Sequence, residues 1–258
     1  MSQEPPQDVV PGLVAHRGYA LRYPENTRVG LLAAVNAGAR WIETDVQLSA
    51  DGVPLLFHDR RLLRVCGVDG AIHEATAAQL SRVRAAEPDF FGDRFADTPL
   101  ATLIEWVELL RDHPGVQCFI EIKTVTIEQF GVQRAVSVVA ETIAPVAERC
   151  VVISFDPRVP PESERCGLPR RGWIAERWDQ VLAPPREVAG IGHLFCNALK
   201  VPHSGSLAAA GVELGLYDVI DRDVASSLFE RGARLVETFD IGAMLGGFRR
   251  RDADAADD

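Results

Sequence analysis

The segment from His16 to Asp59 carries most of the information in this chain. It reads His16-Arg17-Gly18, then Pro24-Glu25-Asn26-Thr27, then Glu43-Thr44-Asp45-Val46-Gln47-Leu48, and it closes with Asp51-Gly52-Val53-Pro54-Leu55-Leu56-Phe57-His58-Asp59. Histidines, an arginine and carboxylates here stand beside apolar, strand-like runs. Ionisable groups next to a core are costly to bury unless they pair, bind a metal or take part in chemistry. We therefore expect the functional site in this segment.

Outward from this segment, short apolar runs alternate with helical patterns, which is typical of repeated βα units and a parallel sheet. A further short strand over Leu55–His58 would form a hairpin with the second of these runs. Eight such strands separated by helices favour an α/β fold, a (β/α)8 TIM barrel, over an open sheet. The expected strands are Leu13–His16, Trp41–Leu48, Cys118–Lys123, Val151–Phe155, Gly172–Ala175, Leu194–Ala198, Glu213–Tyr217 and Leu235–Thr238.

Helix start and stop signals separate these strands. Asn26 precedes an apolar-patterned stretch that ends at Gly38, and Asp221 is expected to cap a helix that stops at Gly232. Thr102 and Glu105 form a capping-box pattern ahead of another helix.

The strings HRG at 16–18, PENT at 24–27, ETDVQL at 43–48, DGVPLLFHD at 51–59 and FIEIK at 119–123 resemble the glycerophosphodiester phosphodiesterase family. Five pieces in order and at fitting spacings make this a specific resemblance, and weaker similarity continues to about residue 240. The resemblance implies a metal-dependent phosphodiesterase on a TIM-type barrel.

The alternation of strands and helices is interrupted between residues 59 and 99. This stretch has turn signals at Gly67 and at Asp69-Gly70, and a helix is expected over Ala77–Ala86, capped by Thr76 with Gln79. It lies where the resembling family carries an insertion over the barrel mouth, so we expect it to shape substrate access. Residues 1–258 then form a single domain, with a charged, disordered tail over about 249–258.

Composition excludes some classes of protein. The net charge of −10 argues against a nucleic-acid binder, which needs a basic face. No apolar run approaches 18 residues, so no membrane span is expected, and the first eleven residues lack the pattern of a leader peptide. The five dispersed cysteines fit reduced thiols better than disulfides, which favours a cytoplasmic protein. The oligomeric state does not follow from the sequence.

Three carboxylates are expected to converge at the barrel mouth. Residues i and i+2 of a strand face the same side, so Glu43 points with Asp45, and Glu121 with Lys123. Carboxylate oxygens at the carboxyl ends of barrel strands suit Mg²⁺ or Ca²⁺. Internal salt bridges are the alternative for these residues. The resemblance favours a divalent cation held by Glu43, Asp45 and Glu121.

His16 and His58 are both expected at strand ends, where imidazole can exchange protons near neutral pH. The resemblance implies that they are the general acid and base, without deciding which is which. Arg17 and Lys123 are expected to contact the substrate phosphate. An ion pair with a barrel carboxylate is the alternative for Arg17.

Other polar residues are given structural roles. Asp59 is interpreted as a turn or cap residue, and Glu25 and Asn26 as holding the first βα loop, with Glu25 also able to support the site. His73, His113 and His193 are expected at the surface, and His203 in a loop. Trp173 and Trp178 could line the mouth or pack in the core.

The carboxyl-terminal part departs from the family pattern. Tyr217-Asp218-Val219-Ile220-Asp221 replaces an aromatic-x-Val-Asn string, and Thr238-Phe239-Asp240 displaces the aspartate of a Thr-Asp pair. These changes leave the matched site positions intact and put the choice of substrate in doubt.

The sequence thus predicts metal-dependent hydrolysis of glycerophosphodiesters to glycerol 3-phosphate and an alcohol, with a small-molecule phosphodiester as the substrate. The attacking group can be the adjacent glycerol hydroxyl or a metal-activated water. Three alternatives stay open: a phosphodiesterase for lysophospholipids or another diester, a catalytically silent phosphate-binding barrel, and, least favoured, an aldolase-like enzyme with Lys123 as a Schiff base.

Overall fold

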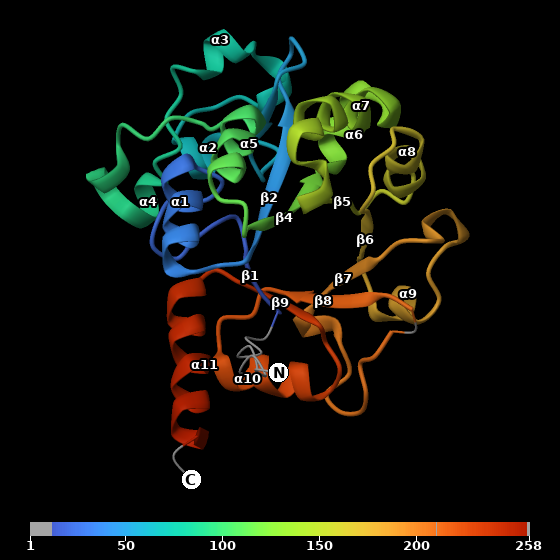
Figure 1. Cartoon of the computed structure of the whole chain (residues 1–258). Helices are drawn as coiled ribbons and strands as arrows, with labels where there is room; N and C mark the ends of the chain where they lie inside the picture. Colours follow the sequence, from blue (N-terminus) through green and yellow to red (C-terminus); the bar gives the residue numbers. More distant parts are fainter. Residues whose placement is uncertain (1–11, 210, 257–258) are drawn as a thin grey trace, which may run out of the picture.

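The computed structural model describes residues 12–209 and 211–256, with side chains to residue 248. Eight parallel strands form the centre, and helices surround them (Figure 1). A ninth strand, β3, runs antiparallel to β2. The strands are β1 Gly12–Ala15, β2 Trp41–Leu48, β3 Pro54–Leu56, β4 Gln117–Ile122, β5 Cys150–Ile153, β6 Gly172–Ala175, β7 His193–Asn197, β8 Glu213–Tyr217 and β9 Leu235–Thr238.

The strand order β5-β4-β2-β1-β9-β8-β7-β6 is that of a nearly closed barrel. The two end strands meet through a bridge between Val152 and Arg171, and the Ile174 N–H donates to the Ser154 carbonyl over 3.0 Å. The expected (β/α)8 barrel is therefore confirmed, with each predicted strand in place to within a residue or two at its ends.

The helices lie between consecutive strands and in the stretch after β3. The α-helices are α1 Arg28–Ala37, α2 Leu63–Cys66, α3 Ala77–Leu80, α4 Pro88–Phe91, α5 Leu103–Asp112, α6 Thr124–Phe130, α7 Val132–Ile143, α8 Val159–Arg165, α9 Trp178–Leu182, α10 Arg222–Glu230 and α11 Ile241–Ala256. Short 3-10 turns are η1 Ile72–Glu74, η2 Gly92–Phe95, η3 Ala144–Arg149, η4 Arg186–Val188 and η5 Ala198–Lys200.

Local capping chemistry explains where several helices begin. Thr102 and Glu105 close the expected capping box of α5, and Asp221 accepts from two backbone N–H groups of α10. The cap of α1 is Thr27, one residue after Asn26, and its hydroxyl accepts from the Gly30 N–H. Asn26 instead has a left-handed φ of 54° and turns its amide toward the barrel.

Hydrophobic residues form three cores. The largest lies between the outer face of the sheet and the helices. A second fills the barrel and contains Val14, Phe119, Val151, Ile153, Ile174, Phe195 and Leu235. A third core lies under the insertion and contains Leu55, Phe57, Leu62, Val65, Ile72, Leu80, Ala85 and Leu100. The insertion is therefore packed as a unit of its own beside the barrel.

Two predicted segments differ from the structure. Helix α3 ends at Leu80 instead of Ala86, because the chain turns there and Arg84 forms a β-bridge with Pro99. The backbone of α11 is helical to Ala256, where a disordered tail from about 249 was predicted. Alanine and arginine, which are strong helix formers, fill much of that stretch. Residues 1–11 and 257–258 lie outside the described part.

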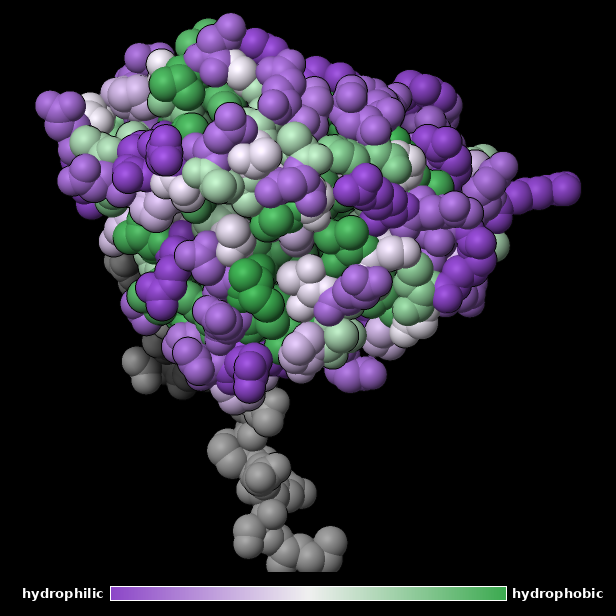
Figure 2. Space-filling view, turned by 90° about the horizontal axis from the view of Figure 1, so that it is seen from above, coloured by the Kyte–Doolittle hydropathy of each residue, from purple (hydrophilic) through white to green (hydrophobic). Residues whose placement is uncertain are grey.

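The face in Figure 2 is mainly hydrophilic, and its hydrophobic residues form small separate groups. Among the described residues no helix is long and apolar enough to cross a membrane. The five cysteines are free thiols, and Cys118, Cys150 and Cys196 are buried in strands. A cytoplasmic location stays a prediction.

The expected surface position of His193 is wrong. The strand β7 begins at this residue, one position earlier than predicted, and its ring is buried 5.2 Å from the Phe119 ring at the amino-terminal end of the barrel. His73 and His113 are half-buried, and His203 is exposed in its loop. Trp173 is a core residue that donates to the Phe155 carbonyl, and Trp178 packs against the core.

Burial of His193 makes stability depend on pH. Desolvation lowers its pKa from 6.5 to about 4, although Glu213, 3.3 Å away, opposes this shift. The unfolded chain then binds the proton more readily, so the contribution is full above pH 6.5 and is lost as the pH falls toward 4. We expect the wild type to lose up to roughly 3 kcal/mol over this range from His193, and H193F to lose less. Urea unfolding at several pH values measures this difference, and parallel curves would contradict it.

Candidate active site

A cavity of about 250 Å³ opens among the carboxyl ends of the strands, which is where active sites of barrels form. It gathers every residue predicted to act in catalysis, phosphate binding or metal binding, apart from Asp45, which is buried 3.2 Å from Lys123 Nζ. The lining residues are His16, Arg17, Glu43, His58, Glu121, Lys123, Ile153, Phe155, Ile174, Phe195, Tyr217, Asp218 and Glu237.

Three carboxylates, those of Glu43, Asp45 and Glu121, form the acidic cluster of this cavity. One oxygen from each lies within 4.8 Å of the others, and all three side chains are buried. Parallel pairing of β2 with β4 sets Asp45 directly beside Glu121, and the two-residue repeat of β2 brings Glu43 to the same face. The predicted convergence of these residues is confirmed.

Each carboxylate of the cluster has a different electrostatic environment. Burial and the neighbouring Asp45 raise the pKa of Glu43 well above its usual value, and burial likewise raises the pKa of Glu121. Burial also opposes ionisation of Asp45, but Lys123 and Arg17 outweigh it and hold its pKa far below the usual range. Repulsion between like charges therefore destabilises the cluster, and a further cation would stabilise it.

The residues fit a hard divalent cation. They supply only oxygen ligands, which Mg²⁺ and Ca²⁺ prefer. Within the part of the chain that the structure describes, Glu43 Oε1 is buried and makes no hydrogen bond. An oxygen left in this state is expensive unless a ligand completes it. Lys123 satisfies part of the cluster from one side, with its Nζ 2.8 Å from Glu121 and 3.2 Å from Asp45.

Arg17 serves the site through both its backbone and its side chain. Its N–H donates to Glu43 over 3.1 Å, and its guanidinium lies 3.2 Å from Glu25 and 3.4 Å from Asp45. These contacts hold a φ of 57°, a left-handed conformation that is strained for a residue with a side chain. The ion pair considered for Arg17 is thus present, and the residue also lines the cavity.

The backbone around Arg17 is shaped to keep it there. Gly18 has a φ of 83°, and a Cβ on it would lie 2.9 Å from the Gly30 backbone, so only glycine lets the loop rest on α1. The Asn26 amide donates to the Asp45 carboxylate over 2.8 Å and accepts from the Asp45 N–H. The predicted loop-holding role of Asn26 is confirmed.

His16 follows β1 and is nearly buried, stacked on Phe239 with ring centroids 4.6 Å apart. Burial and the positive charge of Arg17 lower its pKa well below 6.5, so the ring is neutral near pH 7. Its Nε2 lies 3.7 Å from both Glu43 and Glu237, and its Nδ1 lies 3.6 Å from Asp218. A neutral imidazole in this place can accept a proton.

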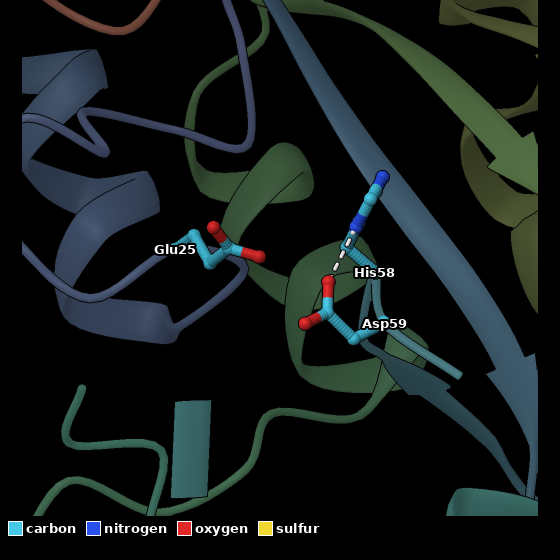
Figure 3. Close-up of side chains that lie close together, drawn as sticks. All are labelled: Glu25, His58 and Asp59. Atoms are coloured by element: carbon cyan, nitrogen blue, oxygen red, sulfur yellow. Dashed lines mark hydrogen bonds and ion pairs between the residues drawn. The ribbon is translucent and has the colours of Figure 1, made fainter. Parts of the chain in front are cut away.

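His58 lies at the cavity wall two residues beyond β3, and its neighbour Asp59 orients it. Figure 3 shows the Asp59 carboxylate next to the imidazole, with 2.7 Å between Oδ1 and Nδ1. The Gln47 amide donates to the carbonyls of residues 57, 58 and 59 and fixes this turn. Asp59 therefore does more than the turn or cap role predicted for it.

Arg64 of α2 ties this pair to the first loop. Its guanidinium donates to both Asp59 oxygens and to both Glu25 oxygens, at 2.7 to 3.0 Å. Glu25, His58 and Asp59 lie close enough to resemble a second metal cluster (Figure 3). The guanidinium groups of Arg64 and Arg17 already pair with these two carboxylates, so we interpret the group as an ion-pair network that positions His58.

Sequence reasoning missed two carboxylates of the cavity. Glu237 of β9 is buried and faces the barrel, and Asp218 follows β8 with a left-handed φ of 67°. The same two-residue rule that placed Glu43 would have found Glu237, since it shares a face with the core residue Leu235. The displaced Asp240 lies at the start of α11, where it accepts a hydrogen bond from Tyr19.

The parallel barrel carries a buried acidic cluster, two histidines and two cations at the carboxyl ends of its strands, where barrel enzymes have their active sites. Residues 16–157 match the glycerophosphoryl diester phosphodiesterase family, and this match covers more than half of the chain. The chain belongs to this family.

Individual relatives agree with this assignment. The chain is 32% identical to a glycerophosphodiester phosphodiesterase of Bacillus altitudinis over 143 residues, 55% of this chain and 57% of the relative. It is 46% identical to the mouse glycerophosphoinositol inositolphosphodiesterase over 77 residues, 30% of this chain and 14% of that protein. The matches thus span less than two thirds of these relatives' lengths.

Among solved structures, a phosphodiesterase of Oleispira antarctica in complex with its product sn-glycerol-3-phosphate superposes with a TM-score of 0.77. The identity is 22%, and the match covers 92% of this chain and 96% of that one. At this identity the likeness confirms the fold.

The acidic cluster makes metal binding testable. We expect saturating Mg²⁺ or Ca²⁺ to raise the unfolding free energy of the wild type by about 2.7 kcal/mol at a hundred times the Kd. E43Q should lose most of this gain, yet without metal it should be at least as stable as the wild type, because one buried like charge is removed. Thermal unfolding with and without EDTA measures both effects. E213Q, at the exposed amino-terminal end of β8, is the matched control, and an equal metal response in E43Q would refute the site.

Proposed function

We propose that this protein hydrolyses glycerophosphodiesters to glycerol 3-phosphate and an alcohol. The observation that carries the proposal is the meeting, in one cavity, of two histidines, two cations and a buried carboxylate triplet. The names of its relatives support the same activity. The small volume, below the roughly 300 to 1,000 Å³ of pockets for drug-sized ligands, suits a compact substrate.

In this proposal Glu43, Asp45 and Glu121 hold a divalent cation. When bound, such an ion neutralises phosphate charge and lowers the pKa of a coordinated oxygen. Arg17 and Lys123 are the cations of the chain at the cavity wall, and they bind the phosphate oxygens, Arg17 through its fork of donors and Lys123 as a point charge. Their carboxylate partners hold both side chains in place before the substrate arrives.

His16 acts as the general base. Its low pKa keeps the ring neutral, so it takes a proton from the attacking oxygen, either the adjacent glycerol hydroxyl or a water molecule. His58 acts as the general acid. Asp59 accepts a hydrogen bond from Nδ1, which leaves Nε2 as the nitrogen that gives a proton to the departing alkoxide.

Purified protein should release glycerol 3-phosphate from glycerophosphocholine, glycerophosphoethanolamine or glycerophosphoinositol, and only with a divalent cation. H16A and H58A should each lower kcat by about 10² to 10⁴-fold, the usual range for losing a general acid or base. H203A, in an exposed loop, is the control. Coupled detection of glycerol 3-phosphate follows the reaction. No release from any of these diesters would reject the function in favour of a silent phosphate-binding barrel.

The network around His58 predicts a second kinetic effect. D59N keeps the shape of the side chain but can present an amide N–H to Nδ1, which favours the wrong tautomer. We expect kcat to fall by about 10 to 100-fold, the usual cost of removing such a supporting partner, with little change in KM. D69N, which removes an exposed partner of Arg61 in the same insertion, should leave both constants unchanged. A D59N enzyme with wild-type kcat would rule out the positioning role.

A further inference from the structure

Glu237 is a buried carboxylate in the cavity to which the proposed chemistry gives no task. It lies on β9 opposite Val14 of β1, with an exposed fraction of 3%. Its strand neighbour Val236 faces the helices, whereas Leu235 packs inside the barrel. Glu237 therefore points inward, into the wall of the cavity that His16 also lines.

The carboxyl group of Glu237 is incompletely satisfied. Its Oε2 lies 3.7 Å from His16 Nε2, which is beyond hydrogen-bond distance. Its Oε1 is buried and makes no hydrogen bond to any residue that the structure describes. A buried polar atom without a hydrogen bond costs about 1 to 3 kcal/mol of stability. Such an atom therefore indicates a position where a ligand binds or where the fold keeps strain for function.

The metal cluster does not account for this atom. Among the described residues at the carboxyl ends of the strands, the group close enough to share an ion consists of Glu43, Asp45 and Glu121 and does not include Glu237. The phosphate does not account for it either, since a carboxylate repels an anion. What remains is an uncharged or cationic part of the substrate in the cavity that Tyr217 and Phe195 also line.

A hydroxyl group suits Glu237 better than an ammonium group. Burial, with the carboxylates of Glu121 and Asp45 nearby, raises the pKa of Glu237 well above its usual value. A hydroxyl both donates and accepts, so it pairs with the carboxylate and with the carboxylic acid alike. An ammonium group pairs only with the ionised form.

We propose that Glu237 binds a free hydroxyl group of the glycerol moiety and so selects glycerol phosphates over phosphates of alcohols that lack such a hydroxyl. The inference rests on the proposed function for the position of the phosphate near Arg17 and Lys123. It makes Glu237 a specificity-determining residue that lies outside the stretch matched to the family, residues 16–157.

Binding of a matched pair of ligands tests the inference. Glycerol 3-phosphate and propyl phosphate share the three-carbon chain and the phosphate but differ in two hydroxyls. With Mg²⁺ present, calorimetry should show that the wild type prefers glycerol 3-phosphate and that E237L reduces this preference by about tenfold, the effect of one lost hydrogen bond to a buried group. Propyl phosphate should bind E237L as tightly as the wild type, or more tightly.

Two further variants guard against a folding defect. E237Q keeps a hydrogen-bonding group in place and should retain most of the preference. E237D withdraws the carboxyl group by one carbon and should lose the preference for glycerol 3-phosphate. It therefore replaces E237L if that variant does not fold. E213L removes a carboxylate at the opposite end of the neighbouring strand and should bind both ligands like the wild type.

An unchanged ratio in both E237L and E237D would overturn the inference. An equal loss of affinity for both ligands would also overturn the inference, because it would place Glu237 in phosphate or metal binding. A wild type that prefers neither ligand also overturns it. The binding measurement needs no turnover. If the protein shows the Glu237-dependent preference but hydrolyses no diester, the proposed function is rejected and the inference about Glu237 is kept.

Discussion

Buried negative charge at the carboxyl ends of β2 and β4 is the constraint that organises this molecule. Glu43, Asp45 and Glu121 cannot lie together in a barrel without positive partners. Lys123 is placed there by the same strand that carries Glu121, and Arg17 by the first loop. The left-handed backbone at Arg17 and Asn26 is the cost of aiming a guanidinium and an amide at Asp45, and the ion pairs maintain it.

The insertion extends this charge pattern beyond the barrel. Arg64 pairs with both Glu25 and Asp59, and the Glu25 N–H donates to Glu87 over 2.6 Å. Alternating charges therefore run from Asp45 through Arg17 and Glu25 to Arg64 and Asp59. Each group limits the freedom of the next, so the orientation of His58 is linked to the position of the acidic cluster without direct contact between them.

How much the sequence predicts depends on how local the cause is. Strand alternation and capping boxes are set by neighbouring residues, so β2, β6, β8, β9 and the start of α5 could be read from the sequence. The convergence of Glu43, Asp45 and Glu121 followed from the two-residue repeat and the resemblance together. The burial of His193 and the role of Asp59 could not be read in this way, because both depend on tertiary partners. For His193 the partner ring is Phe119, and for Asp59 the partner is Arg64. The inward orientation of Glu237 follows from the same two-residue repeat, because it shares a face of its strand with Leu235.

The separate core beneath the insertion has a consequence for durability. His58, Asp59 and Arg64 lie over eight buried residues that form their own cluster, apart from the barrel interior and its outer helices. A small cluster opens at a lower free energy than a large one, and segments that open independently do so without melting the whole chain. Heat or denaturant would therefore displace His58 from the site while the eight-stranded barrel is still folded. The lifetime of the His58 position therefore depends on the hydrophobic core beneath the insertion.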